Sequence, residues 1–401
     1  MTNNKDKKVL NVPNLRFPEF TGEWKKCIIG ELTIKVGSGV TPRGGETVYK
    51  SEGHPFVRSQ NVGLGHLILD DIAYIDEDTH QRQKNTELQL DDVLLNITGA
   101  SIGRSALVNQ QIVGGNVNQH VCIIRANKKL IPSFLCNFLL SQYGQKQIES
   151  FQAGGNRQGL NFEQIKSIKI GLPSVEEQKK IADLLLLIEQ RITTQNKIIE
   201  DLKKLKSAII EIEYSPKDSY HSHIGGAIVQ ISKRNKDNHL CNVLSVSNRQ
   251  GFIKQSEQFE DRNVASDDTS NYKIVEKNDF AYNPARINVG SIARLTKFET
   301  GIVSPMYICF RTKDCLLPEY LELFFESRNF FYHIQKRLEG SVRLCLSYEE
   351  LCNIPIVIPS IEKQKQVDLH LSKLAQKIDL EMKILQFVQQ QKTYLLHQMF
   401  I

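Results

Sequence analysis

The side chains with the clearest chemistry are polar groups in glycine-containing turns. Arginine and lysine can bond phosphate oxygens, and arginine, asparagine and glutamine can also bond base edges in duplex DNA. Turns such as GSGVTPRGG, NITGASIGR and GGNRQGL supply the candidates of the first half: Ser38, Thr41, Arg43, Arg58, Gln60, Asn61, Thr98, Ser101, Arg104, Asn118, Gln119, Arg157 and Gln158. Turns such as SVSNRQG and NPARINVG supply those of the second half: Ser247, Asn248, Arg249, Arg286, Asn288 and Arg343. Because an arginine in such a turn is more often solvated, we expect about a third of these residues to contact bases.

Catalytic motifs that would accompany DNA chemistry are missing from the sequence. An amino-methyltransferase needs an (N/D)PP(Y/F) loop, whereas the segment NPAR at 283–286 lacks the second proline and the aromatic residue that stacks on a flipped base. The phosphate-binding pattern GxxxxGK(S/T) is also absent. Asp91 and Asp92 are expected to be solvated, and His221 and His223 lie in no metal-ligand pattern. We therefore expect a chain without enzymatic activity of its own that binds no metal and no cofactor.

Composition fits a folded chain of more than one domain. Its 401 residues suffice for two or three domains, and 40% hydrophobic with 24% charged residues is an ordinary globular balance. The eight cysteines form no CxxC pair, which argues against a zinc site, and Cys122, Cys309 and Trp24 are expected in cores. No apolar stretch is long enough to span a membrane and no apolar signal segment follows Met1, so we expect a cytoplasmic protein.

The net charge of +6 is too small to identify a nucleic-acid binder by itself. Any surface that binds a polyanion must therefore be local. One acidic run would have to face away from such a surface: Asp70, Asp71, Asp76, Glu77 and Asp78.

The chain contains one unit twice. A shift of 186 residues aligns LPSVEEQKKIADLLLLIEQRI at 172–192 with IPSIEKQKQVDLHLSKLAQKI at 358–378. This shift, or one of 187, also pairs residues of the front segments: Arg125 with Arg311, Arg157 with Arg343, Asp92 with Asp279, Asn96 with Asn283, and Gly103 with Gly290. The match of Arg157 with Arg343 indicates a shared structural or phosphate contact, because residues that read bases should differ between two unlike domains. The glycine pair indicates required backbone turns.

Each rear segment is predicted to be one long helix. Ser174 and Ser360 are typical helix caps, and each precedes a glutamate near the positive end of the helix dipole. Apolar residues then recur with the seven-residue period of a coiled coil. The predicted seam consists of Ile181, Leu185, Ile188, Ile192, Ile199, Leu202, Val367, Leu371, Leu374, Ile378, Leu385 and Val388. Polar residues cover the other faces, which favours helix-on-helix pairing over two helices packed on separate domains.

Each front segment is predicted to be a mixed α/β domain. Short runs such as VLLNIT and VCIIRA indicate strands, and the segments after Pro132 and Pro318 indicate helices. The predicted divisions are a first globular domain at 1–172, a spacer helix at 173–215, a second domain at 216–358 and a second spacer helix at 359–401. The fold class is therefore α+β, with two mixed α/β domains related by a pseudo-two-fold axis and separated by an antiparallel coiled coil of two long helices.

Such an architecture suits a long polymer with equivalent grooves, such as duplex DNA. Two unlike domains would read two unrelated half-sites with an untouched gap between them. The length of the helices would then set the length of that gap.

The order of domain, helix, domain, helix resembles that of the DNA-specificity subunit (HsdS) of type I restriction-modification systems. The resemblance rests on PSVEEQK and PSIEKQK at the two helix starts and on SGVTPRGG, NITGASIGR and GNVNQHVCIIR, and it covers about Phe17 to Phe400. It implies that each domain is a target recognition domain for one half of an asymmetric bipartite site. It further implies that the spacer docks two methyltransferase subunits, which carry S-adenosylmethionine and methylate adenine. The resemblance allows two endonuclease subunits as further partners without requiring them. In the second copy the TPRGG turn has no clear counterpart near Ile224 to Ile231.

Two other classes of function remain. One is a stand-alone DNA-binding regulator with a bipartite site, and the other is a coiled-coil scaffold that binds no DNA. A scaffold gains little from two unlike domains on one frame. Co-purification separates a regulator from a specificity subunit, because a regulator stays alone whereas a specificity subunit retains methyltransferase subunits.

Overall fold

The computed structural model describes residues 10–152, 159–215, 222–248, 250–258, 268–338 and 344–401. The chain divides into two compact units. The first unit contains residues 1–196 with 383–401, and the second contains residues 197–382. Within the described residues, none of the helices combines the length and apolar character needed to cross a membrane.

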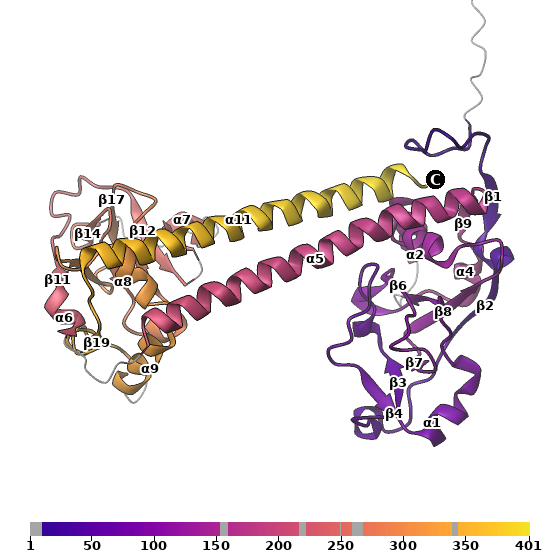
Figure 1. Ribbon diagram of the computed structural model, residues 1–401, viewed down its shortest axis with the longest axis horizontal. Helices are drawn as coiled ribbons and strands as arrows, with labels where there is room; N and C mark the ends of the chain where they lie inside the picture. Colours follow the sequence, from indigo (N-terminus) through magenta and orange to yellow (C-terminus); the bar gives the residue numbers. More distant parts are fainter. Residues whose placement is uncertain (1–9, 153–158, 216–221, 249, 259–267, 339–343) are drawn as a thin grey trace, which may run out of the picture. The chain divides into compact units, whose positions relative to one another are not determined.

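The first unit is built on an antiparallel sheet with the strand order β2-β8-β5-β6 (Figure 1). Its strands are β2 (Thr33–Ser38), β5 (Val93–Asn96), β6 (Ser105–Leu107) and β8 (Val121–Ala126). A smaller sheet has the order β4-β3-β7, with β3 (His54–Val57), β4 (Ala73–Ile75) and β7 (Asn116–Val117). The other elements of this domain are β1 (Lys25–Ile28), β9 (Lys169–Leu172), α1 (Glu77–Arg82), α2 (Pro132–Leu140), α3 (Gln142–Ser150) and α4 (Phe162–Ser167).

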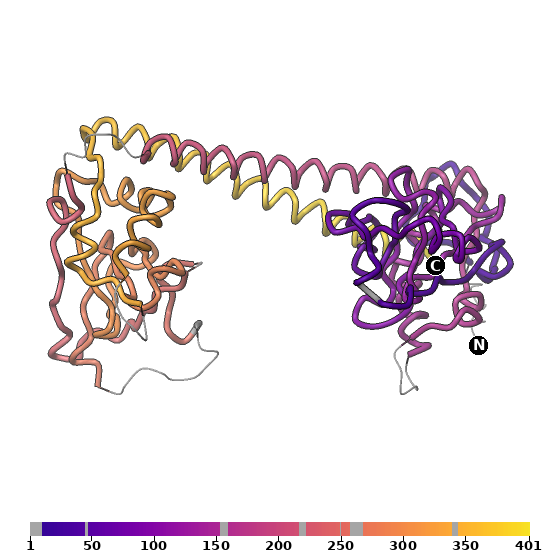
Figure 2. Tube along the Cα trace, turned by 90° about the horizontal axis from the view of Figure 1, so that it is seen from below, coloured from indigo at the N-terminus to yellow at the C-terminus, as the bar shows by residue number. Residues whose placement is uncertain are grey.

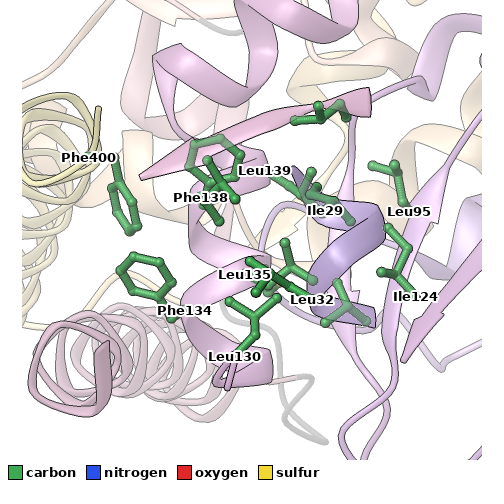
Figure 3. Packing of buried hydrophobic residues seen from close by; sticks show 14 of the residues in the cluster. Ile29, Leu32, Leu95, Ile124, Leu130, Phe134, Leu135, Phe138, Leu139 and Phe400 are labelled. Carbon is green, nitrogen blue, oxygen red and sulfur yellow. The ribbon is translucent and has the colours of Figure 1, made fainter. Parts of the chain in front are cut away.

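Helix α2 supplies the centre of the first unit's core. Phe134 and Phe138 project from it into a buried cluster that includes Ile29 and Leu95 (Figure 3). Trp24 is buried in the same cluster, as predicted. Cys122 is buried too, and desolvation raises the pKa of its thiol to about 12.

The second unit repeats this topology. Its main sheet has the order β11-β18-β15-β16 and its second sheet the order β13-β12-β17-β14. As β3 runs parallel to β7 in the first unit, β12 runs parallel to β17 in the second. The strands are β10 (Ser222–His223), β11 (Ile228–Ile231), β12 (Val243–Ser247), β13 (Gly251–Lys254), β14 (Lys273–Glu276), β15 (Phe280–Tyr282), β16 (Ile292–Arg294), β17 (Thr300–Val303), β18 (Ile308–Thr312) and β19 (Pro355–Ile356). The short helices are α6 (Ile224–Ala227), α7 (Gln255–Gln258), α8 (Pro318–Phe324), α9 (Arg328–Arg337) and α10 (Tyr348–Cys352).

Two long helices complete the fold, α5 (Val175–Glu213) and α11 (Ile361–Gln398). The Oγ atoms of Ser174 and Ser360 accept hydrogen bonds from the backbone N–H groups of Glu177 and Lys363, at 3.2 and 3.4 Å. Both serines therefore cap a helix start, as predicted. The helix bounds lie inside the predicted spacer ranges, while the two compact units divide each long helix between them.

A buried glutamine explains the repeated PSxExQ segment. Gln178 donates to the carbonyls of Lys129 and Pro173 at 3.0 and 3.1 Å and accepts from the N–H of Ile131 at 2.8 Å. Gln364 makes the equivalent bonds to Cys315, Pro359 and Leu317. Each glutamine thus fastens the start of a long helix to the loop that precedes α2 or α8.

The long helices run antiparallel within each unit. In the first unit the beginning of α5 lies beside the end of α11, where Lys392 Nζ is 2.5 Å from Glu189 Oε2. In the second unit the end of α5 lies beside the beginning of α11, where Lys363 Nζ is 3.5 Å from Glu213 Oε2. All twelve predicted seam residues are buried or half-buried. The α+β class with two mixed α/β domains and an antiparallel pair of long helices is thereby confirmed.

An aromatic residue near the end of each long helix enters a domain core. Phe400 lies 5.2 Å from Phe134 and 6.2 Å from Phe138, measured between ring centroids. Its counterpart 186 residues earlier, Tyr214, lies 4.9 Å from Tyr320 and 5.6 Å from Phe324. The chain's last residues therefore return to the first unit (Figure 2), where Leu15 N also donates to the Gln398 carbonyl at 3.0 Å.

Candidate nucleic-acid interface

Four loops of the first unit meet where strands β2, β3, β5 and β7 end. Ser38 at the end of β2 pairs with Cys122, and Asn96 at the end of β5 pairs with Val121. The side chain of Asn96 also donates to the Ser59 carbonyl at 2.8 Å, which links β5 to the loop after β3. A Cβ atom on Gly39 would lie 1.7 Å from the Val117 carbonyl, so the loop after β2 packs directly on the end of β7.

Three candidates in the loop after β3 are bonded to Asp71. Arg58 Nη2 donates to the Asp71 carbonyl at 2.7 Å, and Gln60 and Asn61 donate to the Asp71 side chain. The Arg58 guanidinium also lies 5.4 Å from the centroid of the Tyr49 ring. Asp71, one residue of the acidic run, therefore lies among the candidates of this loop. This carboxylate fixes the orientation of Arg58 and Gln60.

The loops after β5 and β7 are joined by a hydrogen bond between Thr98 Oγ1 and His120 Nδ1 at 2.6 Å. Ser101 Oγ accepts from Asn96 at 3.1 Å, and Asn118 Oδ1 accepts from the His120 N–H at 3.0 Å. These polar groups hold the loops in place. The Arg104 side chain is exposed at the end of the same turn.

Exposure divides the candidates into groups. Exposed are Arg43, Gln60, Arg104, Gln119, Asn248, Arg286 and Asn288, and half-buried are Ser38, Thr41, Arg58, Thr98, Ser101 and Ser247. Asn61 and Asn118 are buried, with side chains 0% and 7% exposed. Outside the described residues lie Arg157, Gln158, Arg249 and Arg343. The exposed group has the access to a ligand that the buried asparagines lack.

The second unit places its candidates at the equivalent edge. Ser291 Oγ donates to the Val246 carbonyl at 3.3 Å, so the turn after β15 packs on the end of β12. Gly290 has φ +87° there and Gly103 has φ +84° in the first unit. The repeated glycine therefore marks the same left-handed backbone position, as predicted. Arg286 and Asn288 are exposed on this turn, close to Asn248.

A basic loop of the second unit was missed by the sequence analysis. Residues 232–240 follow β11, which pairs with β18 as β2 pairs with β8. The loop is thus the counterpart of the TPRGG turn, and it begins one residue after the range in which no counterpart was found. Its signal in the sequence is the run SKRNK at 232–236.

A repeated ion pair lies at the opposite ends of the same strands. Arg125 Nε and Nη2 each lie 2.7 Å from the Asp92 carboxylate, and Arg311 contacts Asp279 at 2.6 and 2.9 Å. The hydrogen bond to each carboxylate raises the pKa of its arginine. The expectation that Asp92 is solvated is wrong, because its side chain is buried by this pairing. These residues hold strands together and lie away from the candidate interface.

The described residues contain no group of three or more histidine, cysteine or acidic side chains placed to hold a metal ion. What the edge offers instead is a set of fixed turns with amide, hydroxyl and guanidinium donors. Such groups can bond phosphates and base edges without breaking or forming covalent bonds.

Comparison with known proteins identifies the kind of domain. Residues 21–204 match the sequence model of the family described as Type I restriction modification DNA specificity domain. The type I restriction enzyme MjaVIII specificity subunit of Methanocaldococcus jannaschii is 24% identical over 213 residues, which are 47% of this chain and 48% of that protein. The chain thus spans about half the length of the archaeal relatives it matches. The type I restriction enzyme EcoKI specificity subunit of Escherichia coli K12 is 21% identical over 389 residues, 86% of this chain and 80% of that protein.

A solved structure shares the fold. The crystal structure of the type I restriction-modification system S subunit from M. genitalium covers 97% of this chain and 99% of its own, with a TM-score of 0.57 and 15% sequence identity. The first of two units with the same main-sheet strand order thus matches the family of type I restriction modification DNA specificity domains, and the relative that is similar over both units is a type I restriction enzyme specificity subunit.

Proposed function

We propose that this chain is the DNA-specificity subunit of a type I restriction-modification complex and binds an asymmetric bipartite site in duplex DNA. Each unit binds one half-site through the loops at its strand ends. The chain performs no chemistry itself, and adenine methylation belongs to partner subunits that carry S-adenosylmethionine.

One observation carries this proposal: the two units keep the frame of a turn and change its side chains. The turn runs from Asn96 to Gly103 in the first unit and from Asn283 to Gly290 in the second. Both asparagines are buried and both glycines have positive φ. Between them, TGAS in one turn corresponds to ARIN in the other. A fixed frame with different side chains is what two readers of unlike sequences require.

The long helices offer a surface for protein partners. Three residues of α5 at seven-residue spacing are exposed outside the seam: Ile198 at 38%, Leu205 at 50% and Ile212 at 74%. Three residues of α11 have the same spacing: Leu380 at 52%, Phe387 at 69% and Tyr394 at 57%. Stripes of exposed apolar side chains mark protein contact surfaces. We assign the two stripes to two methyltransferase subunits, with two endonuclease subunits as further members of the complex.

The test is the methylation motif of a host that expresses the chain with its methyltransferase subunit. Arg104→Ala should relax or abolish recognition in one half of the motif, and Arg286→Ala in the other half, because each arginine belongs to a different unit. Lys277→Gln serves as the control. Lys277 Nζ lies 2.6 Å from Glu299 Oε1, and this ion pair is away from the loops. Single-molecule sequencing of methylated adenines reads both halves. A substitution in one unit that alters both halves together rules out two independent readers.

Co-purification separates this proposal from its alternatives. A specificity subunit retains methyltransferase subunits, and we expect Leu205→Asp and Phe387→Asp to weaken that association. A stand-alone regulator would purify alone and still bind DNA. A scaffold would retain partners and show no sequence-specific binding.

A further inference from the structure

Residues 232–237, 239 and 240 of the second unit, together with Ile274, line a cavity of about 750 Å³. Its charged walls are Lys233, Arg234, Lys236 and Asp237, with His239 beside them. Three cations minus one carboxylate leave a charge of +2 with the histidine neutral. The side chains of all five residues are exposed.

The backbone of this loop is fixed although its charged side chains are exposed. Asn235 is 0% exposed, donates to the Leu240 carbonyl at 3.0 Å and to Thr269 Oγ1 at 3.2 Å, and accepts from the Leu240 N–H at 3.1 Å. The Lys233 carbonyl accepts from the Ile274 N–H at 2.8 Å. A loop closed on a buried asparagine presents its cations with little further loss of backbone entropy when a ligand binds.

The position of the loop matches that of a candidate contact in the first unit. Ser38 pairs with Cys122 where β2 ends, and Ile231 pairs with Cys309 where β11 ends. The chain then enters the loop with Thr41 and Arg43 in one unit and the loop with Lys233 and Arg234 in the other. Equivalent loops of the two units therefore both carry cations, with the larger number in the second.

Basic side chains without fixed hydrogen-bond patterns suit phosphate oxygens better than base edges. Arg234 Nη1 donates to Asn271 Oδ1 at 3.0 Å, which uses one of its five N–H groups. The two lysines are flexible point charges, which attract a phosphate without selecting a base. Contacts of this kind position a protein on DNA and carry no sequence information.

We propose that the cavity lined by Lys233, Arg234 and Lys236 binds a backbone phosphate of the DNA beside the half-site of the second unit. This inference rests on the proposed function. It implies that the loop at 232–240 contributes more electrostatic binding free energy than the equivalent loop of the first unit.

The experiment measures the salt dependence of DNA binding by the complex of the chain with its methyltransferase subunits. The double variant Lys233→Gln, Lys236→Gln should reduce the slope of log K against log salt by about 1, because the one phosphate contact that is lost no longer releases counterions. Affinity at about 0.15 M salt should fall roughly 10-fold or more for every sequence tested, and the methylation motif should stay the same. Lys277→Gln is the matched control for a lysine of the same unit outside the cavity, and its slope should equal that of the wild type.

Three outcomes overturn the inference. An unchanged slope shows that the cavity meets no phosphate of the DNA. A changed methylation motif shows that these residues read bases. Binding of inorganic phosphate that the double variant loses, together with an unchanged slope for DNA, assigns the cavity to a free anion. Failure of the wild-type complex to bind any DNA site specifically contradicts the proposed function instead, so the two failures are distinguishable.

Discussion

Glu189 of the first unit lies between the side chains of His66 and Lys392. Its carboxylate is 3.5 Å from His66 Nδ1 and 2.5 Å from Lys392 Nζ, and Lys392 also donates to the Leu64 carbonyl at 3.3 Å. The hydrogen bond from His66, followed by that from Lys392, lowers the pKa of Glu189 to about 2. This cluster therefore connects the loop after β3 with both long helices.

The stability of the protein should depend on pH through Glu189. A carboxyl whose pKa is lower in the folded state stabilises the fold above its unfolded pKa of about 4.5 and loses that contribution as the pH falls towards 2. Glu189→Gln should therefore lower the free energy of unfolding at pH 7 by about 2 kcal/mol, a value reduced for the partial exposure of the pair. It should also flatten the loss of stability between pH 4.5 and 2. Urea unfolding at both ends of this range measures the effect, and parallel pH curves for variant and wild type would contradict it.

Sequence reasoning at single residues succeeded where the residue's own environment decides and failed where a distant partner decides. Ser174, Ser360 and Gly290 were assigned correctly because caps and turns are local. Asp92 was assigned to solvent because Arg125, its partner, lies 33 residues away. Asn61 is a predicted contact by its residue type, and the structure adds that three hydrogen bonds within its own loop bury it. Residue type shows what a side chain can bond, and the fold decides what it does bond.

At the scale of elements, the ends of the long helices anchor the domains. Phe400 packs on Phe134 and Phe138 in the first unit, and Tyr214 packs on Tyr320 and Phe324 in the second. Tyr214 additionally donates its hydroxyl to the Tyr320 carbonyl at 2.6 Å. A helix whose chain enters a domain core directly after its last turn cannot pivot freely on that domain.

Removal of one anchor should cost far more stability than removal of an exposed aromatic residue on the same helix. Phe400 is 1% exposed and Phe387 is 69% exposed. We expect Phe400→Ala to lower the free energy of unfolding by about 3 kcal/mol through lost burial and a cavity, and Phe387→Ala by less than about 0.5 kcal/mol. Thermal unfolding of the isolated chain compares them. Equal losses for the two variants would show that the end of α11 is no anchor.

The long helices were predictable as elements because their seven-residue period extends over many turns. The loops between the strands of the two domains were harder to predict. The counterpart of the TPRGG turn was missed because the stretch from β2 to β8 in the first unit and the stretch from β11 to β18 in the second differ in length. A fixed shift therefore loses the alignment there. The register of the main sheet restores it, since β2 and β11 pair with equivalent strands.

At the scale of the whole molecule, each long helix belongs to both compact units. Helix α5 begins in the first unit and ends in the second, and α11 begins in the second and ends in the first. The first unit is therefore formed by two separate segments of the chain, and the second by one continuous segment. Because residues 383–401 complete the first unit, a change in the length of one helix alone would disturb its pairing with the other.

A matched change in both helices should alter the gap of the DNA motif and leave its half-sites unchanged. The seam of α5 and α11 repeats every seven residues, so an inserted heptad keeps apolar residues in the seam whereas an insertion of two or five residues turns them out of it. Seven residues inserted after Asn196 and after Met382, where the compact units divide, lengthen each helix by about 10 Å at about 1.5 Å per residue. At about 3.4 Å per base pair this predicts a gap longer by about three base pairs. Methylome sequencing compares the wild type, the heptad variant and a variant with two residues inserted at the same points. The two-residue variant should lose methylation. Methylation of the original motif by the heptad variant would show that the helices do not set the gap.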